Sequence, residues 1–114
     1  MKIETLMESL PENYNFVDRE MVMKAYKFAE KAHEGQTRVS GEPYITHCVS
    51  VAAILAELKV PPAVLIAGLL HDTVEDSSTT TLDIKNNFGE EITRLVDGVT
   101  KLTNLPRVSR GDQI

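Results

Sequence analysis

The sequence predicts an all-α protein that folds as one compact helical bundle. Nearly every segment spaces its apolar residues three or four positions apart, and none alternates apolar with polar residues as a strand does. A chain of 114 residues with 42% hydrophobic content suffices for one domain core. We expect a single domain over residues 1–114, with its core in residues 18–103 and a flexible tail at residues 104–114.

The first two expected helices span about residues 18–33 and 45–58. Asp18 can cap the first helix, and Gly35 can end it. The connecting residues are polar and rich in turn formers, and Cys48 in the second helix is most simply a small core residue. The inward-facing positions of these helices are Val22, Ala25, Tyr26, Ala29, Ala32, Val49, Ala52, Ala53, Leu55 and Ala56.

An apolar segment at residues 63–72 predicts the central helix of the bundle. It is apolar on nearly every side, as expected of a helix that others surround, and Pro62 suits its first turn. The ionisable residues at and beyond its end are His71, Asp72, Glu75 and Asp76. Ordinary helix ends carry a cap and some solvated charge, so this cluster indicates a functional site at the end of a buried helix.

Two further helices are expected after this cluster. Thr80 and Asp83 form the pattern of a capping box, which opens a helix that ends near Gly89. Residues 91–102 offer the last helix of the bundle. Its inward-facing residues are Ile92, Leu95, Val96 and Val99.

Charge, cysteine content and hydropathy exclude several classes of protein. A net charge of −5 argues against nonspecific nucleic-acid binding, which depends on neutralising phosphates. The single cysteine cannot form an intramolecular disulfide. The amino terminus lacks the layout of a signal peptide, and no apolar run approaches the roughly eighteen residues of a membrane span. We therefore expect a cytoplasmic protein that has no nucleic-acid or membrane partner.

The adjacent His71 and Asp72, together with His47 at the start of the preceding helix, suggest a metal site. Two neutral imidazoles and one carboxylate suit Mn²⁺, Fe²⁺ or a similar octahedral ion, whereas the usual tetrahedral zinc set is absent. Glu75 and Asp76 follow the pair by one helical turn, where they can orient a water molecule or take its proton. The residues alone leave two alternatives open: a hydrogen-bonded core histidine at His47 and solvated loop carboxylates at Glu75 and Asp76.

Several longer motifs follow one another in a fixed order. The motifs are Ala32-His33-Glu34-Gly35-Gln36, Arg38, Ser40-Gly41-Glu42-Pro43-Tyr44-Ile45, His47, Leu69-Leu70-His71-Asp72-Thr73-Val74-Glu75-Asp76, Phe88-Gly89-Glu90-Glu91 and Val96-Asp97-Gly98-Val99-Thr100-Lys101-Leu102. In this order they resemble the hydrolase domain of the Rel/SpoT alarmone enzymes. The resemblance covers about residues 18–105.

The resemblance implies a helical domain of the His-Asp (HD) metal-dependent phosphohydrolase superfamily. Such a domain uses Mn²⁺ in the stringent response to remove pyrophosphate from the 3′ position of (p)ppGpp, which leaves GDP or GTP. The metal ligands would then be His47, His71 and Asp72. Glu75 and Asp76 would activate or position the attacking water.

The resemblance also implies a nucleotide pocket beside these residues. Arg38 would stack on the guanine base or contact the nucleotide, since a guanidinium plane suits both a purine face and an anion. Ser40 would line the same pocket. We interpret His33, Tyr44 and residues 97–102 as scaffold, because packing or capping explains each of them.

Two departures from the family pattern affect this expectation. Val39 stands where family members usually carry a basic residue. The fourth metal ligand of the family, an aspartate in a Leu-Ala-Asp-Arg-Leu-His-Asn type motif, does not occur before Ile114, and Asp112 has the wrong context to replace it. We therefore expect a fragment that is incomplete at its C-terminal side, binds Mn²⁺ weakly and is not active alone.

Missing helices would also leave apolar surface on the central helix and on Ile92, Leu95 and Val99, so we expect a dimer or a higher oligomer. Two other functions stay open. One is an HD phosphohydrolase that acts on another nucleotide, such as NADPH or a nucleoside phosphate, which Val39 permits. The other is a nucleotide-sensing or interaction module whose metal site is vestigial, although the intact carboxylate pair, Glu75 and Asp76, argues against a decayed site.

Overall fold

The computed structural model describes residues 2–76 and 79–103, except for the side chains of residues 75, 76 and 100–103. This part of the chain contains helices and no strand, which confirms the predicted all-α class. The predicted tail, residues 104–114, lies outside the described residues. The helices are α1 (Ile3–Ser9), α2 (Phe16–Ala32), α3 (Tyr44–Glu57), α4 (Pro62–Asp76), α5 (Thr81–Phe88) and α6 (Glu90–Thr103).

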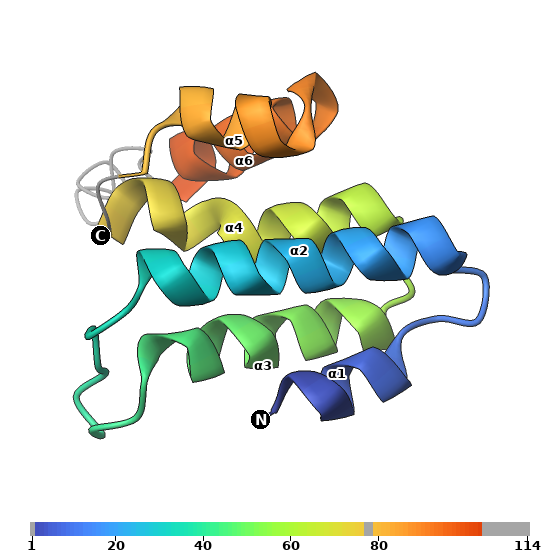
Figure 1. Cartoon of the computed structure of the whole chain (residues 1–114), viewed down its shortest axis with the longest axis horizontal. Coiled ribbons are helices and arrows are strands. Elements are labelled where there is room, and N and C mark those ends of the chain that lie inside the picture. The colour runs from blue at the N-terminus through green and yellow to red at the C-terminus, as the bar shows by residue number, and fades with distance from the viewer. Residues whose placement is uncertain (1, 77–78, 104–114) are drawn as a thin grey trace, which may run out of the picture.

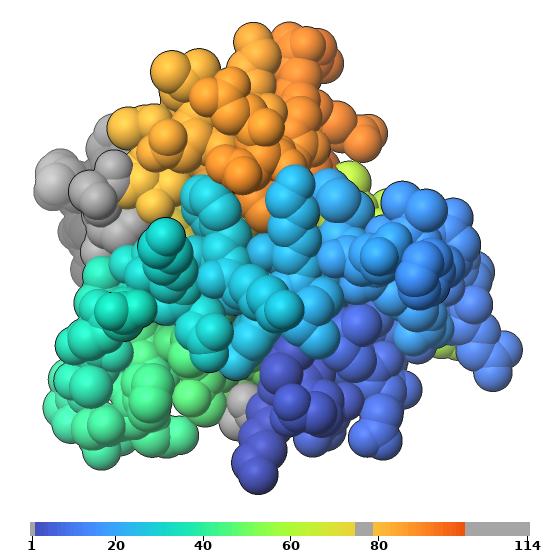
Figure 2. Space-filling view, in the orientation of Figure 1, coloured from blue at the N-terminus to red at the C-terminus, as the bar shows by residue number. Residues whose placement is uncertain are grey.

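Helix α4 is the central element of the bundle. It packs against α2, α3 and α6, while α1 packs against α3 and α5 packs against α6 (Figure 1). On the face shown in Figure 2, α2 crosses the middle of the molecule between α5 and α1. Gly68 lets α3 approach α4 closely, because a Cβ atom at this position would lie 2.5 Å from Cδ1 of Leu55.

The apolar positions predicted for α4 are buried as expected. Its buried apolar residues are Leu65, Ile66, Ala67, Leu69 and Leu70. Burial of one Leu or Ile side chain contributes roughly 1.5–3 kcal/mol, so α4 accounts for a large share of the core free energy. The helix runs one turn beyond its predicted end and stops at Asp76, so the backbone of Glu75 is helical.

The prediction missed α1, and it placed the start of the core at residue 18. The buried residues in this region are Ile3, Leu6, Leu10 and Tyr14, so the core begins at residue 3. Arg19 of α2 fixes this region, because its guanidinium donates hydrogen bonds to three backbone carbonyls between Met7 and Tyr14. A helix of seven residues without a side-chain cap gives too short a pattern to detect.

Capping side chains set the starts of α2 and α5. Asp18 is not the cap of α2 but the third residue of the helix, and Asn15 is the cap. The side chain of Asn15 accepts a hydrogen bond from Asp18 N at 2.7 Å, and the Asp18 carboxylate accepts one from Asn15 N at 2.9 Å. The equivalent box predicted for Thr80 and Asp83 is confirmed at the start of α5.

The apolar side chains that are exposed to solvent differ from those that the sequence predicts. Ile92 is only 5% exposed, so the prediction that it forms part of an exposed apolar surface is wrong, whereas Leu95 and Val99 are half-buried and keep part of their surface exposed. Among the described residues, the exposed large apolar side chains are instead Phe16, Val17, Val39, Ile54, Leu58 and Leu82. Within the same residues, no helix has both the length and the hydropathy needed to cross a membrane.

The burial of α4 leads to a stability prediction. Leu69→Ala should lower the free energy of unfolding by about 2–5 kcal/mol, because Leu69 is fully buried and its truncation leaves a cavity. Leu82→Ala is the matched control, since Leu82 is 63% exposed in α5 and its loss should cost less than about 0.5 kcal/mol. Urea unfolding followed by circular dichroism measures both values. Equal losses in the two variants would contradict the central position of α4.

Candidate functional site

The elements that carry the predicted site residues meet at one end of the bundle. Helices α2 and α4 end there, α3 begins there, and the loop of residues 33–43 joins α2 to α3 at the same end (Figure 1). The hydroxyl of Tyr44, the first residue of α3, donates a hydrogen bond of 2.9 Å to Oδ2 of Asp72 in α4. The fold therefore brings the α3 start and the predicted His71–Asp72 pair into direct contact.

Backbone hydrogen bonds fix the loop that carries Arg38. Arg38 N donates to the carbonyl of Glu42 at 2.9 Å, and a short bridge pairs Thr37 with Pro43. Gly41 has a φ of +92°, a conformation that glycine adopts without steric cost. The loop is therefore a small closed turn that holds Arg38 next to the start of α3.

Asp72 binds two different side chains through its two carboxylate oxygens. Oδ1 lies 3.0 Å from Nε2 of His71, and Oδ2 accepts the hydrogen bond from Tyr44. Nδ1 of His71 lies 2.8 Å from the carbonyl oxygen of Gly68, which can only accept, so this nitrogen carries a proton. Both ring nitrogens of His71 thus face oxygen acceptors, which is the geometry of an imidazolium beside a carboxylate.

The surroundings of Asp72 favour its ionised form. Burial alone raises the pKa of this carboxyl group. The hydrogen bond and the charge of His71, the hydroxyl of Tyr44 and the charge of His47 act in the opposite direction, and together they leave the pKa of Asp72 below its usual value. A mostly buried carboxylate that stays ionised is suited to binding a cation.

His47 contacts Arg38 on the neighbouring loop. A guanidinium nitrogen of Arg38 lies 2.5 Å from Nδ1 of His47, and because guanidinium only donates, Nδ1 is the acceptor. Burial, followed by the positive charge of Arg38, lowers the pKa of His47, and Asp72 partly offsets the effect. The imidazole is therefore neutral near pH 7, the form in which histidine binds metal ions.

The three predicted metal ligands have suitable donor atoms, but in this structure they bind other partners. Among the side chains that the structure describes, no three of the His, Cys, Asp and Glu type are arranged to hold a metal ion. His71 and Asp72 pair with each other, and Nδ1 of His47 accepts from Arg38. The side chains of Glu75 and Asp76 lie outside the described part of the chain.

Two pockets at this end of the bundle share Arg38 and Glu42. A pocket of about 120 Å³ is lined by Arg38, Glu42, Thr46, His47 and Ser50. A pocket of about 530 Å³ is lined by Arg38, Val39, Ser40 and Glu42. The predicted residue Ser40 thus shares a pocket with Arg38, while the Val39 side chain is fully exposed beside them.

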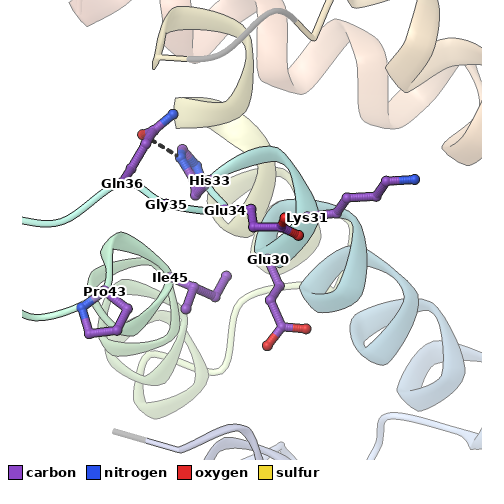
Figure 3. A pocket seen from close by; sticks show the side chains of 8 residues that line it. All are labelled: Glu30, Lys31, His33, Glu34, Gly35, Gln36, Pro43 and Ile45. Carbon is purple, nitrogen blue, oxygen red and sulfur yellow. Dashed lines mark hydrogen bonds between the residues drawn. The ribbon is translucent and has the colours of Figure 1, made fainter.

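A third pocket, of about 590 Å³, lies where α2 meets the loop and the start of α3 (Figure 3). His33, one of its lining residues, is buried, and its Nδ1 lies 3.0 Å from the side-chain oxygen of Gln36. The imidazole of His33 also lies against the ring of Tyr44, with 4.7 Å between ring centroids. The rings of the buried His33 and the half-buried Tyr44 therefore connect this pocket to Asp72.

Sequence reasoning missed the contact of Tyr44 with the site. The sequence alone suggests a scaffold role for Tyr44, yet its hydroxyl donates a hydrogen bond to Asp72, and its ring centroid lies 5.5 Å from that of His47. One signal in the sequence was available: Tyr44 precedes His47 by three positions, which places both on one face of a helix. The partner in α4 could not be found in this way, because it comes from another helix.

Comparison with known proteins identifies the class of this domain. The family model of the HD domain matches residues 25–113, so the chain belongs to the HD domain family. A GTP pyrophosphokinase of Streptomyces coelicolor is 57% identical over 81 residues, which are 71% of this chain and 10% of that protein. The bifunctional (p)ppGpp synthase/hydrolase SpoT of Escherichia coli is 55% identical over 82 residues, 72% of this chain and 12% of that protein.

A more distant relative extends the match. The probable chloroplastic GTP diphosphokinase RSH3 of Oryza sativa is 42% identical over 105 residues, which are 92% of this chain and 15% of that protein. These proteins confirm the predicted resemblance to the Rel/SpoT family, and the chain spans 10–15% of their length. Their names include both kinases and a hydrolase, so the activity of this chain has to be argued from its site.

The lowered pKa of His47 predicts how stability depends on pH. The unfolded chain takes up a proton at His47 near pH 6.5, the ordinary value, whereas the folded chain does so only at lower pH. The stabilising contribution is therefore present above about pH 6.5 and is lost as the pH falls through the lowered pKa. Urea unfolding between about pH 7 and about pH 5 should show a smaller loss of stability in His47→Gln than in the parent chain. Identical losses in both proteins would contradict the prediction.

Proposed function

We propose that this chain is the hydrolase part of a Rel/SpoT protein and acts in the removal of pyrophosphate from the 3′ position of (p)ppGpp. The observation that carries the proposal is the contact of the His71–Asp72 pair of α4 with the start of α3, beside the loop that holds Arg38. A relative from Escherichia coli O157:H7, 55% identical over 82 residues, is named guanosine-3′,5′-bis(diphosphate) 3′-pyrophosphohydrolase, which supports this choice of activity.

The donor set supports Mn²⁺ as the cofactor. Two imidazole nitrogens and one carboxylate oxygen suit an octahedral ion that keeps open positions for water and phosphate oxygens. His47, His71 and Asp72 would hold the ion after the proton between His71 and Asp72 leaves and Arg38 moves away from His47. When bound, the ion would lower the pKa of a coordinated water and offset phosphate charge.

Hydrogen bonds around the ligands support the same assignment. Nδ1 of His71 donates to the carbonyl of Gly68, which directs Nε2 toward Asp72, beside which a cation would bind. Such a partner on the second ring nitrogen is a usual feature of metal-binding histidines. The hydrogen bonds that Asp72 accepts from His71 and Tyr44 also help to lower its pKa, and the carboxylate therefore stays charged at neutral pH.

The two pockets that share Arg38 fit a nucleotide with phosphates on both sides of its ribose. Arg38 offers planar stacking to a base and hydrogen bonds to an anion. The smaller pocket reaches His47, and the larger one contains Ser40 and the exposed Val39. We assign the phosphate to be cleaved to the side of His47 and the guanosine to the side of Ser40.

Glu75 and Asp76 complete the proposed reaction. Their backbone lies in the last turn of α4, one turn after His71 and Asp72. One carboxylate would orient the attacking water and take its proton. Water would form a bond to the phosphorus next to the 3′ oxygen, and the bond between that oxygen and phosphorus would break, so that the water oxygen leaves with the pyrophosphate. The 3′ oxygen would take up the proton that the carboxylate removed from the water, either directly or through solvent, and end as a hydroxyl of GDP or GTP.

A chimera tests this function directly. The 82-residue segment of the Escherichia coli synthase/hydrolase that matches this chain is replaced by the corresponding residues of the chain. We expect release of pyrophosphate from ppGpp that requires Mn²⁺. His71→Ala combined with Asp72→Ala should lower the release by more than about 100-fold. Mutation of a residue that only hydrogen-bonds a metal ligand already lowers metal affinity or activity by about 10- to 100-fold.

The synthase activity of the same chimera is the control for folding. A chimera that still synthesises and binds (p)ppGpp but releases no pyrophosphate with Mn²⁺ would contradict the hydrolase function. It would instead favour the nucleotide-sensing module. Release from NADPH or a nucleoside phosphate without release from ppGpp would favour a different substrate.

Arg38 gives a separate prediction for substrate binding. Arg38→Ala in the chimera should raise the KM for ppGpp by about 10- to 100-fold, because a hydrogen bond to a charged group contributes about 1.5–3 kcal/mol. Arg94→Ala is the matched control, since Arg94 is exposed and pairs with Glu90 one turn away in α6. Steady-state kinetics measure both variants, and an unchanged KM in Arg38→Ala would exclude Arg38 from the nucleotide pocket.

A further inference from the structure

Tyr44 holds one oxygen of the carboxylate that the proposed function uses as a metal ligand. We propose that Tyr44 is a positioning residue, which fixes Oδ2 of Asp72 by a hydrogen bond and thereby presents Oδ1 to a bound cation. This inference rests on the proposed function, because it assumes that Asp72 binds a metal ion. It assigns a role to a side chain that packing alone would otherwise explain.

The hydrogen bond from Tyr44 to Asp72 has little competition from His71 or from water. Tyr44 donates at 2.9 Å to Oδ2, while His71 faces Oδ1 at 3.0 Å, so the two oxygens have different partners. The side chain of Asp72 is only 12% exposed, which limits its hydration. Without the hydroxyl, the carboxylate could rotate and offer either oxygen or both oxygens to an ion, and the site would lose its preorganisation.

The ring of Tyr44 contacts two imidazoles. The centroid of the His33 ring lies 4.7 Å from that of Tyr44 at an interplanar angle of 33°, and the centroid of the His47 ring lies 5.5 Å away at an angle of 68°. His33 is 2% exposed, and its Nδ1 pairs with the side chain of Gln36 at the edge of the third pocket (Figure 3). The direction of the Tyr44 hydroxyl is therefore fixed before any ligand binds.

The other two tyrosines of the chain show what a structural hydroxyl does here. Tyr14 is buried and donates to the backbone carbonyl of Val60 at 2.6 Å, which ties the segment after α1 to the loop before α4. Tyr26 donates to the exposed carboxylate of Glu30 at 3.0 Å, one turn away on the same helix. Tyr44 differs from both because its acceptor is a partly buried carboxylate from another helix, in the proposed metal site.

Manganese affinity tests the inference with the chain as it is. Tyr44→Phe keeps the ring against His33 but removes the hydroxyl, and we expect its Kd for Mn²⁺ to rise about 10- to 100-fold, as for other partners of metal ligands. Tyr26→Phe is the matched control and should leave the Kd unchanged, because it also removes one hydroxyl that binds a carboxylate. Electron paramagnetic resonance of free Mn²⁺ gives the Kd, and circular dichroism without metal checks the fold. Asp72→Ala shows how much Mn²⁺ affinity is lost when a proposed metal ligand is removed.

The outcomes separate this inference from the proposed function. If Tyr44→Phe and the parent chain bind Mn²⁺ equally while Asp72→Ala does not bind, Tyr44 is scaffold and the metal site stands. If Tyr44→Phe is less stable without metal but keeps its Mn²⁺ affinity, the positioning role is again overturned. If Asp72→Ala binds Mn²⁺ as tightly as the parent chain, or the parent chain binds none, the proposed metal site is wrong and this inference fails with it.

Discussion

The burial of α4 by α2, α3 and α6 is the constraint on which the rest of the structure depends. A helix that is apolar on nearly every side is stable only when other helices remove it from water, so their positions follow from it. Gly68 permits the close approach of α3, and its carbonyl also accepts the hydrogen bond from His71. The packing that stabilises the bundle therefore also fixes the histidine and the aspartate that follow the apolar run.

The polar groups at the end of α4 are partly buried, and their mutual hydrogen bonds and charges offset the cost of removing them from water. Asp72 stays ionised because His71 and Tyr44 each bind one of its oxygens, and His47 stays neutral beside Arg38. A divalent cation entering this cluster would displace the proton between His71 and Asp72 and the guanidinium of Arg38. The net charge of the site would then stay nearly the same, although the side chains would have to move. Such an exchange would allow the same side chains to be stable without an ion and to bind one in the site that we propose.

Family membership and site chemistry answer different questions about this protein. The HD domain occurs in relatives named as kinases and in a relative named as a synthase/hydrolase, and the chain corresponds to 10–15% of each. The hydrolase function that we propose for this segment is supported by the local arrangement of imidazole, carboxylate and guanidinium groups. Val39 places an exposed apolar side chain at the rim of the larger pocket, where the resemblance to the family leads us to expect a cation.

The sequence by itself determined the helical class, the central position of the 63–72 segment, the capping box at Thr80 and the identity of the metal-ligand candidates. These features depend on local periodicity and on residue types, which a sequence displays directly. Only the tertiary structure decided that α1 joins the core, that Arg38 binds His47, and that Tyr44 holds Asp72 across 28 positions of sequence. The physical reason is that hydrogen bonds between side chains of different elements depend on how buried helices pack, and no local pattern specifies that packing.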